Sequence, residues 1–98
     1  MMAYLLVRWL HDFADDPILL FSELGGDRYE TRKVGIFRGG RVGLAGAGLE
    51  VGGGGLGVVA VPAVSEIATS PESVAQEPSA DEFEAVWRIA LQVTGAAP

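Results

Sequence analysis

The first part of the chain is rich in apolar, β-prone residues, and these predict β-strands, in which side chains point to two faces with a period of two. Residues 3–11 predict the first strand, and Arg8 indicates that one of its two faces is only partly buried. Residues 18–24 begin with a continuous apolar run, which is typical of a central strand that is buried on both faces. Between these strands, three Asp residues and Pro17 predict a loop.

A third strand over residues 28–38 leads into Gly39-Gly40, which predicts a hairpin with a two-residue loop. This loop would place Phe37 opposite Val42 and Gly35 opposite Leu44. We therefore expect Phe37, Val42 and Leu44 to share the core face of the sheet, and Val34 and Ile36 to share the other face with Gly43 and Ala45.

The middle of the chain gives weaker signals. Residues 46–57 contain seven glycines, whose ordering costs conformational entropy, so we expect a mobile loop. Residues 58–61 are β-prone and precede Pro62, which favours a last strand at a sheet edge. A short helix is expected over 64–69, and the polar residues 70–78 suggest a linker along the surface.

The strongest element begins at Ser79, where Ser79 and Glu82 form a capping-box pattern. Gly95 ends the helix. One stripe of this helix is apolar at helical spacing and must pack on the sheet; it consists of Phe83, Val86, Trp87, Ala90, Leu91 and Thr94. The sequence therefore predicts one α+β domain over residues 1–98, in which an antiparallel sheet of four to five strands packs against a C-terminal amphipathic helix.

Charge is divided unevenly along the chain. Residues 1–45 hold six acids and six bases, whereas residues 46–98 hold seven acids and only Arg88, which accounts for the net charge of −6. Acidic surface repels phosphate backbones and argues against a nucleic-acid partner. It is compatible with a solvated surface, or with a docking face for a basic protein such as a toxin.

The chain contains no cysteine, which excludes disulfides and thiolate metal sites and is compatible with a reducing compartment. Residues 1–10 are apolar but lack the basic start of a signal peptide. No apolar run approaches the ~20 residues of a membrane-spanning helix. We therefore expect a cytoplasmic protein with no membrane partner.

Two patterns suggest small-molecule or metal chemistry, and each is incomplete. Residues 52–57 match Gly-x-Gly-x-x-Gly, but a strand rather than a helix is expected to follow, so a dinucleotide site is not predicted. His11 lies beside Asp12, Asp15 and Asp16, yet there is neither a second His nor a Cys, and a solvated acidic turn explains the cluster better. The sequence predicts no cofactor and no metal.

A polar cluster surrounds the second and third strands. Alternation places Arg28, Glu30 and Arg32 on one face, with Glu23 on the neighbouring strand. Cross-strand ion pairs on a solvated face explain the cluster, and a polar recognition surface is the alternative. The candidate partner-binding residues are Trp9, His11, Asp12, Glu23, Arg28, Glu30 and Arg32.

Several blocks of the sequence, in order, resemble a known family. They include residues 9–12, 18–24, 28–34, 36–40 and 82–87. Together they resemble the small bacterial domain of unknown function DUF6881, over nearly the whole chain. The resemblance implies no activity. Size and acidity are also similar to those of the immunity proteins of polymorphic toxin systems, which is an analogy of properties and not of motifs.

Three functions are compatible with these patterns. The first is a non-catalytic protein-binding domain, such as an immunity or antitoxin-like inhibitor of a basic partner. The second is a small hydrolase or ligand-binding enzyme that uses His11 and Asp12 together with Glu23, Arg28, Glu30 and Arg32. The third is an accessory domain that forms homodimers through an exposed sheet edge.

Overall fold

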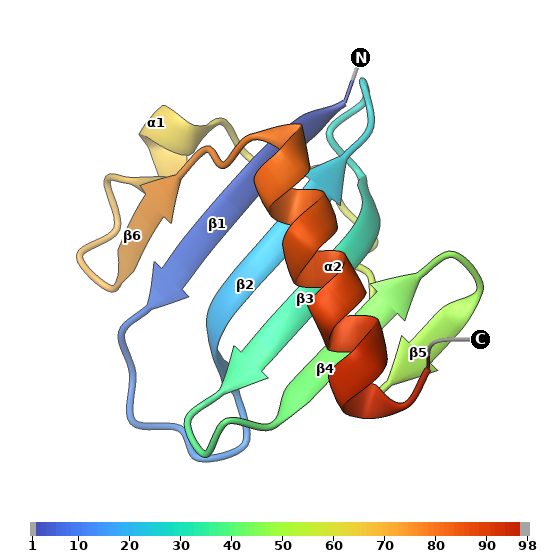
Figure 1. Ribbon diagram of the computed structural model, residues 1–98. Helices are drawn as coiled ribbons and strands as arrows, with labels where there is room; N and C mark the ends of the chain where they lie inside the picture. Colours follow the sequence, from blue (N-terminus) through green and yellow to red (C-terminus); the bar gives the residue numbers. More distant parts are fainter. Residues whose placement is uncertain (1, 97–98) are drawn as a thin grey trace.

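The computed structural model describes residues 2–96, and its centre is one antiparallel sheet of six strands. The strands lie in the order β5-β4-β3-β2-β1-β6, so β2 is central as predicted (Figure 1). Their bounds are β1 Ala3–Trp9, β2 Pro17–Leu24, β3 Glu30–Phe37, β4 Val42–Gly46, β5 Leu49–Val51 and β6 Ser73–Gln76. The α+β class is confirmed, with one strand more than the sequence predicted.

Helix α2, Ala80–Thr94, covers one face of the sheet, and the predicted signals determine both of its ends. Ser79 Oγ accepts the Glu82 N–H at 3.1 Å, and the Glu82 carboxylate accepts the Ser79 N–H at 2.9 Å. This reciprocal pair is the capping box. Gly95 ends the helix in the left-handed conformation, with φ of 73°.

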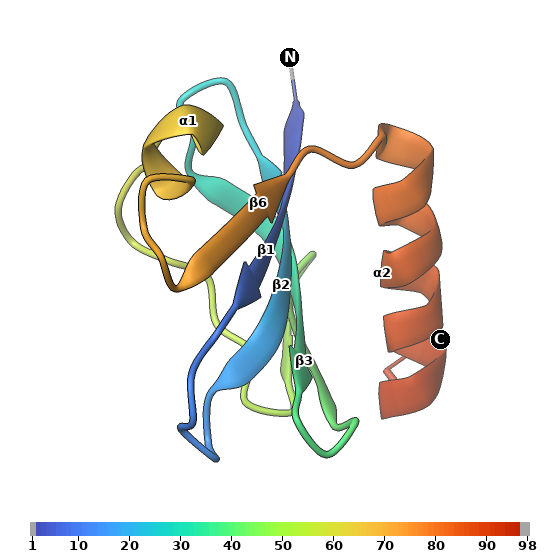
Figure 2. The ribbon, with the colours of Figure 1, turned by 90° about the vertical axis from the view of Figure 1, so that its left-hand side faces the viewer.

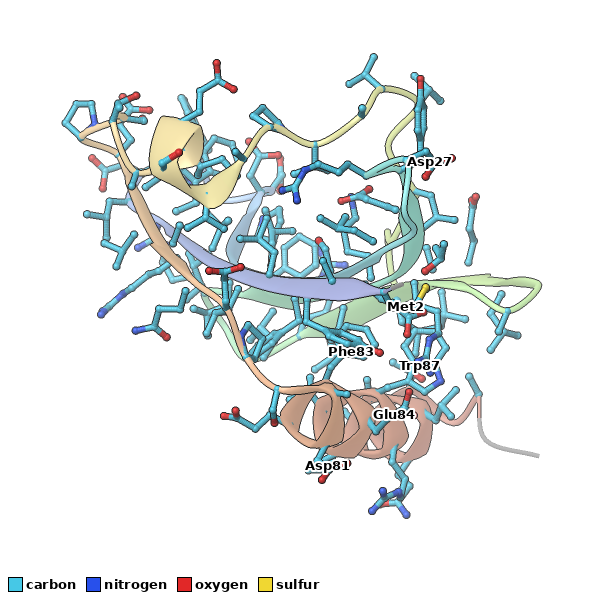
Figure 3. All side chains as sticks on the ribbon, turned by 90° about the horizontal axis from the view of Figure 1, so that it is seen from above. Met2, Asp27, Asp81, Phe83, Glu84 and Trp87 are labelled. Atoms are coloured by element: carbon cyan, nitrogen blue, oxygen red, sulfur yellow. The ribbon has the colours of Figure 1, made fainter. Side chains whose placement is uncertain are left out.

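The main core lies between α2 and the central strands. Phe83, Trp87 and Ala90 are buried against Val34 and Leu44. Figure 3 shows Phe83 and Trp87 between the helix and the sheet, and Asp81 on the side of the helix that points away from it. Packing of this apolar stripe stabilises a helix that would be marginal in isolation, and the predicted docking of α2 is confirmed.

The opposite face of the sheet is covered by helix α1, Val64–Ile67, and by the segment that precedes it (Figure 2). The short helix predicted over 64–69 is therefore present. Arg28 attaches this segment, because its Nε and Nη2 atoms donate to the carbonyls of Val61 and Pro62, both at 2.7 Å. Val61 N–H in turn donates to the Arg28 carbonyl at 2.8 Å.

The predicted β3–β4 register is wrong by one residue. Phe37 N–H donates to the Arg41 carbonyl, and Gly40 N–H donates to the Phe37 carbonyl, each at 2.9 Å. The loop therefore has three residues, 38–40, and Gly40 takes a left-handed φ of 91° while Gly39 does not. A three-residue loop with one left-handed glycine is the next most common hairpin after the two-residue loop.

Because side chains alternate with a period of two, this shift reverses the predicted face of the β3 side chains, whereas Val42 and Leu44 lie on the core face as predicted. Ile36 pairs with Val42 and Val34 with Leu44, and Val34 and Leu44 lie in the core below α2. Phe37 is buried on the other face, outside that core.

The sheet edges also differ from the prediction. Residues 58–61 form no strand, and Val58 is 86% exposed. The edge strand is instead β6, within the predicted linker 70–78, and it pairs with β1 from Leu6–Gln76 to Trp9–Ser73. Four residues carry too short a pattern to reveal a strand, and β6 is held by a partner about seventy positions earlier in the chain.

The glycine-rich segment, expected to be mobile, has defined contacts with the sheet. Residues 49–51 form β5, which pairs with β4. A Cβ at Gly54 would overlap the Leu44 carbonyl, and one at Gly43 would lie 2.8 Å from the Gly52 carbonyl oxygen. These glycines allow two stretches of backbone to approach each other closely.

Candidate functional site

Helix α2 crosses the sheet diagonally and leaves β6 and the adjacent parts of β1 and β2 uncovered on its face (Figure 1). This area is hollowed into a groove of about 730 Å³, called the open groove below. Strand register explains its lining, because Arg8 pairs with both Leu19 and Val74, and cross-strand partners point to the same face.

The open groove combines an apolar floor with a few charged groups. Its apolar members are Leu6, Trp9, Leu10, Ile18, Leu19 and Val74. Its polar members are Arg8, His11, Asp12, Arg38 and Gln76. An apolar floor with a small number of polar groups is the usual composition of a binding site. Val74 is 46% exposed and is available for contact.

His11 is fixed in the groove wall by both of its ring nitrogens. Nδ1 accepts the Phe13 N–H at 2.9 Å, so the hydrogen on Nε2 donates to the Pro17 carbonyl at 2.8 Å. The ring also packs against Trp9, with centroids 4.1 Å apart. With both nitrogens hydrogen-bonded, this imidazole serves as a structural link in the loop after β1.

Arg38 joins two parts of the groove wall that are distant in sequence. Its guanidinium donates to the carbonyl of His11, which connects the β3–β4 turn to the loop after β1. Arg38 was not a predicted site residue, and the shifted hairpin register places it at this position. No group of three or more His, Cys, Asp or Glu side chains within residues 2–96 is arranged to hold a metal ion.

Glu23 and Arg32 lie elsewhere, in an ionic network below α2. Arg32 donates to Glu23 from Nε at 2.8 Å and from Nη2 at 2.6 Å, and it also pairs with Glu84 on the helix. Its guanidinium carbon lies 5.1 and 5.2 Å from the ring centroids of Phe83 and Trp87. Such cation–π contacts and a bidentate pair orient the helix on the sheet.

The electrostatics of this network follow from its hydrogen bonds. The Arg32 guanidinium holds the pKa of Glu23 below its ordinary value, although burial acts in the opposite direction. The bond to Glu23 likewise raises the pKa of Arg32. Burial, followed by the hydrogen bond to Glu23, raises the pKa of Tyr4. Three side chains thus donate four hydrogen bonds to one buried carboxylate, since Thr31 also donates to it at 2.8 Å.

Glu30 and Arg28 lie on the face of the sheet that points away from α2, whereas Arg32 lies below α2. The prediction that Arg28, Glu30 and Arg32 share one face is therefore wrong. The register shifts between Glu23 and Leu24, which reverses the alternation before Arg32. Glu30 accepts from Ser22 at 3.2 Å and from Lys33 at 3.0 Å, and it also accepts the Gly57 N–H. Arg28, at φ of 64°, lies outside the strand.

The seven predicted partner-binding residues therefore lie in three places. Trp9, His11 and Asp12 line the open groove, whereas Glu23 and Arg32 are below α2 and Arg28 and Glu30 are on the opposite face. Sequence reasoning missed Val74 and Gln76, because β6 was not recognised as a strand.

Acidic side chains surround the strand that borders the groove. Glu72 and Glu77 directly precede and follow β6, and both are exposed. Glu66 lies in α1, and Asp81 and Glu82 lie in the first turn of α2. No Lys, Arg or His occurs between Val51 and Arg88. The β6 edge of the sheet is therefore negatively charged, whereas the groove itself contains Arg8, Arg38 and Asp12.

The fold and the groove define a small α+β domain with one open sheet face beside an acidic edge strand. Residues 3–92 match the domain of unknown function DUF6881, and the chain belongs to that family. No curated protein and no solved structure matches the chain. Neither of the helices within residues 2–96 has the length and apolar character needed to cross a membrane.

Proposed function

We propose that the chain is a non-catalytic protein-binding domain that receives a basic partner protein at the open groove and the adjoining strand β6. The open groove carries this proposal, because it is a concave, apolar area of sheet that no element of residues 2–96 covers. Removal of such apolar surface from water by a partner lowers the free energy and therefore favours binding.

The acidic edge supports a basic partner. Glu72 and Glu77 flank β6, and Glu66 and Asp81 lie on the neighbouring helices. Complementary charge speeds the encounter of two proteins and disfavours partners of the same sign. Arg8 and Arg38 lie within the groove and would face the apolar part of the partner rather than its basic residues.

The biological form that fits these properties is an inhibitor of the immunity or antitoxin type, which acts in the cytoplasm by covering a basic toxin. A compact scaffold with a rigid, preformed face suits such inhibition, because little conformational entropy is lost on binding. The absence of cysteine agrees with a reducing compartment.

An enzyme built on the predicted polar cluster is supported less well. Its six residues lie in three separate places, and both nitrogens of His11 are already hydrogen-bonded. General acid–base chemistry requires its groups to lie within reach of one substrate.

The proposal is tested with two matched variants, Val74→Glu in the groove and Ile89→Glu on the outer side of α2. The two side chains are similarly exposed, at 46% and 58%, and only Val74 lines the groove. Each protein is immobilised and exposed to lysate of the organism that carries the gene, and retained proteins are quantified by mass spectrometry. We expect a basic protein that wild type and Ile89→Glu retain and Val74→Glu loses.

The retained protein is then expressed alone and together with the chain. For an inhibitor, expression alone stops growth, co-expression with wild type restores growth, and co-expression with Val74→Glu does not. A set of retained proteins that is identical for the two variants would contradict the proposal.

A further inference from the structure

Strand β6 ends the sheet with one side unpaired. Leu10 N–H donates to the Glu72 carbonyl at 2.7 Å, which makes Leu10–Glu72 a hydrogen-bonded pair. Because such pairs alternate along an antiparallel ladder, the backbone groups of Val74 and Gln76 point to β1, and those of Ser73 and Ala75 point outward. The outward N–H of Ser73 already donates to the Ser70 carbonyl at 3.2 Å. No hydrogen bond within residues 2–96 uses the outward groups of Ala75.

No other helix or strand of residues 2–96 lies in front of this side of β6 in Figure 2. Figure 2 views the molecule from that edge, and β6 lies in front of the sheet with α1 above it. The next strand position beyond β6 would continue the sheet alongside the open groove, because Val74 and Gln76 belong both to β6 and to the groove lining.

We propose that the basic partner contributes an extended segment that pairs with β6 as a seventh strand. The inference rests on the proposed function and specifies its binding mode. Strand addition takes affinity from backbone hydrogen bonds and specificity from alternate side chains. Here the Ala75 N–H and carbonyl supply the central pair of backbone bonds, and the open groove receives every second side chain.

The surroundings of β6 define the residues of that segment. Side chains on the groove side would lie next to Val74, over an apolar floor, and should be apolar. Side chains on the other side would lie next to α1, which carries Glu66, and should be basic. Glu72 and Glu77 stand at the two ends of β6 and favour a basic residue at each end of the added strand.

The same charges disfavour a second copy of this chain as the occupant. Pairing β6 with β6 of another copy would bring together two acidic edges, each with Glu72 and Glu77 and with no base between Val51 and Arg88. Charged side chains on edge strands are a common device against such pairing.

The probe is a seven-residue peptide of alternating lysine and valine, and the matched control peptide has glutamate in place of lysine. Binding is followed by NMR of the labelled chain, with hydrogen exchange of the Ala75 amide as the specific readout. We expect the lysine peptide, at about 1 mM, to shift resonances of β6 and the open groove. It should slow exchange at Ala75 by about tenfold or more.

Two variants of the chain make the test specific. Ala75→Pro removes the outward N–H without removing a bond to β1, and proline is tolerated at such edge positions. Ala75→Ser keeps the N–H and serves as the control. Ala75→Pro should lose peptide binding at unchanged melting temperature, and Ala75→Ser should keep it.

Several outcomes would overturn strand addition. They are absence of peptide binding, equal binding of the glutamate peptide, binding that Ala75→Pro retains, and protection of Ala75 that increases with protein concentration in the absence of peptide. The last result would identify a second copy as the occupant. If Val74→Glu loses the cellular partner and Ala75→Pro keeps it, the proposed function stands and this binding mode fails.

Discussion

Glu23 and Arg32 connect the sheet to α2 through charge as well as packing. Their side chains retain 9% and 19% of their exposure, and Arg32 also contacts Glu84 and the rings of Phe83 and Trp87. A buried carboxylate is costly unless its hydrogen bonds are satisfied. These residues therefore contribute to the structure of the domain as a cross-strand ion pair, which the sequence suggested, with a recognition surface as the alternative.

Removal of one partner from this pair should destabilise the protein strongly. Arg32→Met leaves the Glu23 carboxylate buried without its cation, and we expect a loss of about 3 kcal/mol in the free energy of unfolding. The double variant Glu23→Met/Arg32→Met removes both charges and should recover at least half of that loss. Urea denaturation measures both values, and a double variant less stable than Arg32→Met would contradict this account.

The same carboxylate should make stability depend on pH. Since the pKa of Glu23 is lowered in the folded state, ionised Glu23 contributes fully to the free energy of unfolding above its unfolded-state pKa of about 4.3. That contribution is lost as the pH falls from this value through the folded pKa. We expect Glu23→Gln to flatten the decline in unfolding free energy in acid. Glu82, whose pKa is also lowered, is present in both proteins, so the difference between them isolates Glu23.

At the scale of elements, α2 follows directly from its sequence, whereas the strands depend on their partners. Ser79, the apolar stripe and Gly95 are local signals, and they predict both ends and the buried side of the helix. The β3–β4 register was not local in this way, because Gly39-Gly40 is compatible with loops of two or three residues. One left-handed residue, Gly40, decides the length of the loop and thereby which β3 side chains share a face with Val42 and Leu44.

The composition of the glycine-rich segment predicted a mobile loop, and its close contact with β4 can be tested by adding a methyl group. Gly54→Ala places a methyl group into the Leu44 carbonyl and should cost about 1–3 kcal/mol. Gly55→Ala meets no atom within 4 Å and should change the unfolding free energy by less than about 0.5 kcal/mol. Thermal unfolding monitored by circular dichroism compares the two. Equal stability would show that this segment is not held against β4.

At the scale of the whole molecule, the sequence predicted the layers and the charge but not the site. Trp9, His11 and Asp12 were candidates, and they do line one groove. The groove is also lined by Arg38, placed by the hairpin register, and by Val74 and Gln76 on β6. Both depend on long-range pairing, for which a four-residue strand and an ambiguous turn give no local signal.

Charge at the β6 edge should also control self-association of the domain through that edge. Glu72 and Glu77 are exposed and flank the unpaired backbone of Ala75, so neutralising them removes repulsion between two such edges. We expect Glu72→Gln/Glu77→Gln to form dimers or larger species at concentrations where wild type is a monomer, as measured by light scattering after size exclusion. Glu50→Gln, on the opposite edge strand β5, is the control and should remain monomeric. If the double variant and this control behave alike, charge is not what protects β6, and the preference for a basic partner segment loses its physical basis.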